Sequence, residues 1–256
     1  MAVDLRTPEE IARMRRAGEI LAGALDVVVH AVQPDATGVA LDRLAETYIR
    51  DHGAEPAFKG YRGYPASLCI SINEEVVHGI PSQRPIAPGD LVSVDLGVKL
   101  QGWHVDAARS LVVPPADSAD SALVAAAWEA FYAGFGQIRP GVKLGDVQAA
   151  IQTVIERHGY GLVRDLTGHG IGRSLHEAPD IPNYGNRGTG LSLQAGMTFC
   201  IEPMLTRGSG DVRTEADDWT IIAADRTRAA HVEETVLVTP DGAELLTGSR
   251  QAVQTR

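Results

Sequence analysis

The chain has 256 residues, of which 44% are hydrophobic, enough for the core of one large domain or two small ones. Its formal net charge is −10, and no stretch gathers Lys and Arg into a basic stripe, which excludes nucleic acid as an expected partner. No stretch resembles a signal peptide or a membrane span. We therefore expect a soluble cytoplasmic protein whose two cysteines, Cys69 and Cys200, are free thiols.

The first predicted element is a long amphipathic helix that begins after Thr7. Thr7 and Glu10 have the spacing of a capping box, and Pro8 occupies the first helical position, where its missing N–H costs nothing. An apolar stripe with helical spacing follows, formed by Ile11, Met14, Leu21, Leu25 and Val28.

The sequence contains an internal repeat. Residues 33–53 resemble residues 139–159 at an offset of 106, and each reads as a Pro/Gly turn, an amphipathic helix and a glycine stop. Residues 88–97 match residues 195–204 at an offset of 107, so that each half carries a strand expected to end near a carboxylate. Chance similarity is the alternative, but the near-constant offset favours duplication. We expect one domain over residues 1–256 with halves at roughly 7–115 and 119–247.

The predicted strands are rich in β-branched residues and follow their helices instead of alternating with them singly. They are "LVSVDLGV", "RSLVVP", "MTFCIEPM", "WTIIAA" and "ETVLVTP". This order predicts an α+β fold class with two related halves.

Several acids and one histidine stand within or beside these strands. An unpaired carboxylate is costly to bury, and of the cationic side chains only Lys99 and Arg109 lie close in sequence to the first two acids. Salt bridges or helix caps are the alternative for any single acid, but a divalent cation accounts for the set. The residues are Asp95, Asp106, His169, Glu202 and Glu233.

The chemistry of this set favours Mn, Fe, Co or Zn, because it is rich in carboxylate, has imidazole and lacks thiolate. Bridging carboxylates would allow two such ions side by side, and spacing alone does not separate the candidate metals.

Six separated motifs, in order, resemble type I methionine aminopeptidase. They are "GYPASLCISINEEVVHGIP", "VDLG", "GWHVDAARS", "TGHGIGRSLHEAP", "FCIEPM" and "AHVEETVLV", and the resemblance extends from about Thr7 to Thr247. It implies a pita-bread fold, a single catalytic domain of two pseudo-symmetric halves, each with helices packed on antiparallel strands and with a dinuclear metal site between them.

The resemblance assigns the metal ligands. It implies that His169 and Glu202 bind one ion, that Asp95 serves mainly the other, and that Asp106 and Glu233 bridge both. Glu234 stands where the family commonly has histidine, and strand alternation places it on the opposite face from Glu233.

The same resemblance implies a mechanism. A water shared by two divalent ions can lose its proton near neutral pH, and the resulting hydroxide would attack the first peptide bond. Glu202 is the expected general base. His176 would hydrogen-bond the substrate, and His78 would contact the scissile amide nitrogen or the second residue. Taken alone, either histidine would be an ordinary loop or core residue.

Two further histidines, His104 and His231, each lie two residues before a proposed ligand, where strand alternation puts them on the ligand's face. Their roles stay open, and a structural role is favoured for both.

The substrate pocket implied by the resemblance is aromatic and contains sulfur, which suits an unbranched, soft methionine side chain, although such a cluster is more often plain core. Its residues are Tyr61, Tyr64, Cys69, Leu175 and Trp219, with Phe58 at the edge. A narrow pocket beyond the first residue would admit only a small second residue.

The expected partner is therefore the N-terminus of a nascent polypeptide or peptide. The chain is expected to be a monomer, and contact with the ribosome is left open. Val105 and Gly97 depart from the commonest family pattern without removing a ligand.

Two alternative functions are considered, a related pita-bread peptidase and a binding protein without catalytic activity. Xaa-Pro aminopeptidase and prolidase share the same five ligands but carry an additional N-terminal domain, which this chain is not expected to have. A non-catalytic peptide-binding relative would be expected to have lost ligands.

Overall fold

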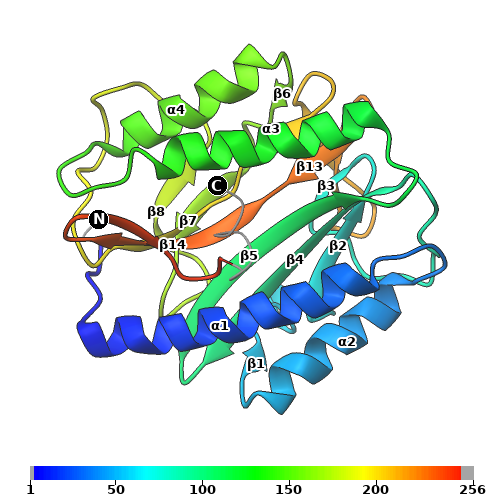
Figure 1. Ribbon diagram of the computed structural model, residues 1–256, viewed down its shortest axis with the longest axis horizontal. Helices are drawn as coiled ribbons and strands as arrows, with labels where there is room; N and C mark the ends of the chain where they lie inside the picture. Colours follow the sequence, from blue (N-terminus) through cyan, green and yellow to red (C-terminus); the bar gives the residue numbers. More distant parts are fainter. Residues whose placement is uncertain (1–2, 249–256) are drawn as a thin grey trace.

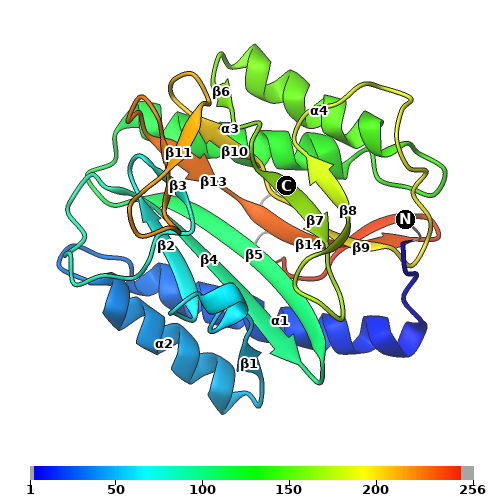
Figure 2. The ribbon, with the colours of Figure 1, turned by 180° about the vertical axis from the view of Figure 1, so that it is seen from behind.

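Two pairs of α-helices lie on one face of a curved antiparallel sheet in the computed structural model, which describes residues 3–248 (Figure 1). The first pair is α1 (Pro8–Ala31) with α2 (Gly38–Asp51), and the second is α3 (Ser118–Phe135) with α4 (Leu144–Arg157). A short 3₁₀ turn, η1, spans Tyr61–Gly63. Seen from behind, the sheet and its loops lie in front of the helices (Figure 2).

The largest sheet has the strand order β1-β4-β5-β14-β9-β7-β8, with β2 paired to β4 and β15 to β14. Two smaller sheets have the orders β13-β10-β6 and β11-β12-β3. The strands are β1 (Glu55–Pro56), β2 (Leu68–Ile72), β3 (Glu75–Val77), β4 (Leu91–Leu100), β5 (Trp103–Val112), β6 (Gly161–Leu162), β7 (Thr167–Gly170), β8 (Glu177–Pro182), β9 (Thr198–Ile201), β10 (Met204–Thr206), β11 (Val212–Thr214), β12 (Ile221–Ala223), β13 (Ala229–His231), β14 (Glu233–Thr239) and β15 (Gly242–Leu245).

Helix α1 begins as its sequence predicts. The Thr7 hydroxyl accepts from the Glu10 N–H and the Glu10 carboxylate accepts from the Thr7 N–H, which completes the capping box. The buried stripe, which includes Met14, Leu21 and Val28, packs on β4 and β5. Burial of this stripe fixes α1 against the sheet.

The repeat of helices follows the predicted offset. Both α2 and α4 have 14 residues, and α4 begins and ends 106 positions after α2. The core is also divided, with one large cluster around Leu21, Leu25 and Trp103 and another around Phe131 and Ile151, besides a smaller third cluster. The α+β class is confirmed, and the exact bounds of the two halves stay a prediction.

The strands that carry the acids differ from the sequence prediction in two ways. Asp95 lies in the middle of β4, which continues to Leu100, so the expectation that this strand ends near its carboxylate was wrong. The predicted strand 197–204 is divided at Glu202, because Pro203 has no N–H to donate to a neighbouring strand. Glu202 therefore lies in the gap between β9 and β10.

The two halves meet where β5 pairs with β14, and a buried ion pair crosses this junction. Arg109 Nη2 lies 2.7 Å from Glu234 Oε1, and Arg109 Nη1 donates to the Glu233 carbonyl at 3.0 Å. The Thr247 hydroxyl donates to Glu234 Oε2, and the guanidinium lies over the Trp128 ring of α3. Glu234 thus turns away from Glu233, as strand alternation predicts.

Within residues 3–248 no helix is long and apolar enough to cross a membrane.

We expect Arg109→Met to lower the free energy of unfolding by about 3 kcal/mol, because it leaves the Glu234 carboxylate, only 2% exposed, without its cation. The double variant Arg109→Met/Glu234→Met should recover much of that loss, since neither charge remains buried. Urea unfolding of the metal-free protein measures both. A double variant as unstable as the single one would contradict the assigned role of the pair.

Candidate active site

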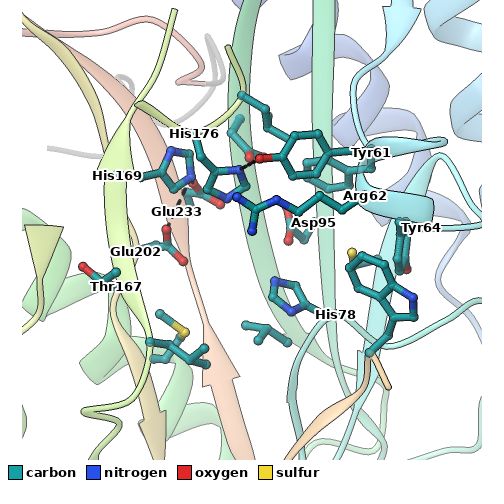
Figure 3. Close-up of a pocket in the computed structure, with 18 of the residues that line it drawn as sticks. Tyr61, Arg62, Tyr64, His78, Asp95, Thr167, His169, His176, Glu202 and Glu233 are labelled. Atoms are coloured by element: carbon teal, nitrogen blue, oxygen red, sulfur yellow. Dashed lines mark hydrogen bonds and ion pairs between the residues drawn. The ribbon is translucent and has the colours of Figure 1, made fainter. Parts of the chain in front are cut away.

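One cavity of about 250 Å³ gathers all of the side chains that the sequence assigned to metal, catalysis and substrate (Figure 3). The predicted ligands that line it are Asp95, Asp106, His169, Glu202 and Glu233. The predicted substrate-contacting residues that line it are Tyr61, Tyr64, Cys69, His78, Leu175, His176 and Trp219, with Phe58 beside them.

The five predicted ligands come from five consecutive positions across the large sheet. Reading across it, β4 carries Asp95, β5 carries Asp106, β14 begins with Glu233, β9 is followed by Glu202 and β7 contains His169. Neighbouring strands are about 5 Å apart, so a row of side chains on one face can converge on a small volume. Positions far apart in the sequence thereby become one site.

The carboxylates are buried, and no cationic side chain in the part of the chain that the structure describes pairs with them. Asp95 Oδ1, Asp106 Oδ1 and Glu233 Oε1 have no hydrogen-bond partner within the described part of the chain. Burial raises the pKa of Asp106 well above its ordinary value, and repulsion from Glu233 raises it further. Burial also raises the pKa of Glu202, with Asp95 adding to it.

The two cations nearest in sequence do not neutralise this cluster. Lys99 faces Glu55 at 3.8 Å, and Arg109 pairs with Glu234. No Lys or Arg within residues 3–248 forms an ion pair with the predicted ligands. The donor set therefore suits divalent cations, whose charge would offset the repulsion that raises the acid pKa values.

His169 is oriented to offer one ring nitrogen to the carboxylates. Its Nδ1 lies 2.9 Å from the Gly170 carbonyl, which can only accept, so Nδ1 carries the proton and Nε2 keeps its lone pair. His169 Nε2 faces Glu202 Oε1 at 3.7 Å and Glu233 Oε1 at 4.0 Å. Burial lowers the pKa of His169 to about 4, which keeps the ring neutral.

Metal-ligating atoms form more than one group around Glu233. Asp95, Asp106 and Glu233 place one oxygen each within 4.8 Å of one another, and one ligand atom each of Glu202, His231 and Glu233 lie equally close together. Cys200 is near enough to join His169 and Glu233, but burial raises the pKa of its thiol, which disfavours the thiolate a metal needs.

The second histidine of the "GHGIGRSLHEAP" stretch has a different environment from the first. The His176 ring lies 4.0 Å from that of His169, but its Nδ1 contacts the Tyr61 hydroxyl at 2.9 Å, and the His176 and Tyr61 rings stack. Desolvation and repulsion from His169 lower the pKa of His176. His78 lies across the cavity, in the left-handed backbone region at φ 61° (Figure 3).

The apolar end of the cavity is aromatic. Tyr64 and Trp219 meet edge to face with centroids 5.0 Å apart, and the Tyr64 hydroxyl reaches the Leu68 and Gly79 carbonyls. Glycine at position 97, where the sequence departs from the commonest family pattern, has a steric reason. A Cβ atom at this position would lie 2.6 Å from the Phe58 ring. The Phe58 ring occupies the space that a larger residue at position 97 would need.

Sequence reasoning did not find every residue that lines the cavity. Arg62, Val77, Asp165, Leu166, Thr167 and Met204 also line it. Of these, Met204 and Thr167 stand at the edges of quoted motifs, and their proximity to predicted ligands was the available signal. His231, whose role the sequence left open, lies against the carboxylates, whereas His104 Nδ1 faces the Gly172 carbonyl.

Comparison with known proteins agrees with this geometry. The sequence pattern of metallopeptidase family M24 matches residues 12–240. The chain is 46% identical over 252 residues to methionine aminopeptidase 1 of Mycobacterium tuberculosis, covering 96% of this chain and 95% of that protein. The crystal structure of methionine aminopeptidase from Rickettsia prowazekii superposes with a TM-score of 0.95 at 41% identity, covering 96% of this chain and all of that one.

The chain therefore belongs to metallopeptidase family M24. The predicted resemblance to methionine aminopeptidases, the pita-bread fold and the class of metallo-aminopeptidase are confirmed by these relatives. Prolidase from Pyrococcus furiosus is more distant, with 25% identity and a TM-score of 0.78, and the chain covers 66% of it.

We expect the metal-free protein to lose stability as the pH rises above about 6.5. An acid whose pKa is raised by folding stabilises the fold while protonated, and this contribution is lost as the pH rises through its folded pKa. His78 and His169, with pKa values lowered to about 4, give the opposite slope only below their ordinary value of 6.5. Asp106→Asn should therefore be more stable than wild type at about pH 9.

Thermal melts with chelator and with added Mn measure this effect. With added Mn, wild type should be more stable than Asp106→Asn, because the variant lacks one of the negative charges that bind the cation. If metal-free wild type and Asp106→Asn had the same pH dependence, the repulsion within the cluster would be disproved.

Proposed function

We propose that the chain removes the N-terminal methionine from nascent proteins and peptides whose second residue is small, using two divalent ions. The observation that carries this proposal is the convergence of the five predicted ligands on one cavity whose other end is lined by Tyr64, Cys69 and Trp219. Membership of family M24 and the names of the close relatives support a metal-dependent aminopeptidase.

The proposed metal set follows the positions of the side chains. His169 and Glu202 would hold one ion, Asp95 would serve mainly the other, and Asp106 and Glu233 would be shared. The orphaned oxygens of Asp95, Asp106 and Glu233 support this assignment. When bound, such ions supply Lewis acidity for the scissile carbonyl and for an attacking water. Mn, Fe, Co and Zn all remain candidates.

The remaining steps belong to the side chains. Glu202, which lines the cavity beside His169 and Glu233, takes the proton of the attacking water and passes it to the leaving amine. His176, held by Tyr61, donates to the carbonyl oxygen as negative charge develops there. His78 approaches the scissile amide nitrogen or the second residue from the other wall.

The substrate is selected at its first two residues. The aromatic and thiol surface of Tyr64, Trp219 and Cys69 is uncharged and polarisable, as an unbranched thioether side chain requires. Location in the cytoplasm, a monomeric state and contact with the ribosome stay predictions from the sequence.

The direct test is release of methionine from Met-Ala-Ser by protein stripped of metal and then given Mn, Fe, Co or Zn in turn. We expect activity to require added metal and to fall strongly with Met-Leu-Ser, because the proposed specificity admits only a small second residue. Absence of release with every metal would refute the proposal. Preferred cleavage of Xaa-Pro peptides would instead favour the alternative function, an Xaa-Pro aminopeptidase or prolidase-like peptidase.

For the two substrate-contacting histidines we expect His78→Ala and His176→Ala each to lower turnover by about 10²- to 10³-fold while metal content is retained, because each removes one positioned donor. His52→Ala is the control, since His52 lies at the exposed C-terminal end of α2. Kinetics with metal analysis of each variant measure the effect. Near-normal turnover in either variant would remove that histidine from the mechanism.

A further inference from the structure

His231 is a buried histidine with an unpartnered ring nitrogen beside the predicted ligands. It ends β13, two residues before Glu233, and is only 2% exposed. Its Nε2 has no hydrogen-bond partner within residues 3–248. Its backbone is held firmly, because its N–H donates to Ser110 Oγ at 2.9 Å and its carbonyl accepts from the same hydroxyl. A buried polar atom of this kind requires a partner.

The nearest candidates for that partner are two carboxylates. His231 Nε2 lies 3.6 Å from Glu202 Oε2 and 3.9 Å from Glu233 Oε2. His169 Nε2 faces the Oε1 atoms of the same two residues. The two imidazoles therefore address opposite oxygens of one carboxylate pair.

The two imidazoles differ in their relation to the cavity. His169 lines it together with Glu202 and Glu233, whereas His231 is not part of its lining. His231 thus reaches the carboxylates from outside the cavity, although one of its ring nitrogens and one oxygen each of Glu202 and Glu233 lie within 4.8 Å of one another. A hydrogen bond to a ligand fits this placement better than ligation of the ion itself.

We propose that His231 is a positioning residue that donates a hydrogen bond from Nε2 to Glu202 Oε2 and so directs Oε1 towards the cavity. This hydrogen bond requires that Nε2 carries a ring proton. A movement of about 0.7 Å would bring His231 Nε2 and Glu202 Oε2, now 3.6 Å apart, to hydrogen-bond length. The significance of Oε1 for proton transfer rests on the proposed function.

This arrangement has an energetic consequence. Groups that hydrogen-bond a ligating carboxylate fix its orientation, and their loss typically lowers metal affinity or activity about 10- to 100-fold. Since His231 acts on Glu202 and not on the substrate, its loss should lower metal affinity and kcat while KM changes little.

Three variants separate the possible roles. His231→Gln keeps an N–H near the Nε2 position but is a poor metal ligand, whereas His231→Leu removes the donor. His231→Asn stays polar but is too short to reach Glu202, and it serves if the leucine variant fails to fold. His104→Gln is the matched control, because His104 stands two residues before Asp106 but faces the Gly172 carbonyl.

The measurements are Mn(II) and Co(II) binding to each metal-free protein by calorimetry, the visible spectrum of the Co(II) forms, and kcat and KM with Met-Ala-Ser. We expect His231→Leu and His231→Asn to lose about 10- to 100-fold in metal affinity. His231→Gln should remain within a few-fold of wild type with an unchanged Co(II) spectrum, and His104→Gln should bind metal normally.

Two results would overturn the proposal. If His231→Gln lost affinity as severely as His231→Leu and altered the Co(II) spectrum, His231 would be a ligand. If His231→Leu bound metal and turned over substrate like wild type, the residue would be structural only. Failure of the proposed function is distinguishable, because wild type would then bind metal without releasing methionine while the affinities still decided the role of His231.

Discussion

Mutual repulsion among buried carboxylates is the interaction on which the rest of this site depends. Asp95, Asp106, Glu202 and Glu233 share a small, poorly solvated volume, and each has a raised pKa because burial opposes its ionisation. In the absence of a cation, such a cluster destabilises the fold as it ionises. The hydrogen bonds of the sheet keep the carboxylates together nevertheless. A divalent cation that binds among them would relieve their repulsion, and this relief would add to its binding affinity.

The sheet can hold these charges because its own hydrogen bonds do not depend on them. β4, β5, β14, β9 and β7 are neighbours, and their ladders fix the backbone of each ligand or of the residue next to it. Helix pairs on the other face supply the apolar burial that stabilises the sheet. At the β5–β14 junction, the Arg109–Glu234 pair adds a contact that also reaches the Glu233 carbonyl.

Neighbouring histidines acquire different tasks from their hydrogen-bond partners. His169 and His176 have rings 4.0 Å apart, but the first is turned to the carboxylates by the Gly170 carbonyl and the second to the cavity wall by Tyr61. His231 completes the pattern, since it meets the same carboxylates from the opposite side. A partner for one ring nitrogen determines what the other nitrogen can do.

The sequence by itself determined the repeated helices and the α+β class, and it pointed to many of the residues that line the cavity. Capping at Thr7 and the repeated helix pattern depend on neighbours a few residues apart, and local chemistry is legible in a sequence. The acids were visible because carboxylates are rare in apolar strands. Only the tertiary structure decided that Asp95 lies mid-strand, that Pro203 leaves Glu202 in a gap, and that His231 faces carboxylates while His104 faces a carbonyl. Those outcomes depend on which strands are neighbours and on where each histidine ring lies relative to the carboxylates. Pairing between strands that are distant in the sequence determines both features.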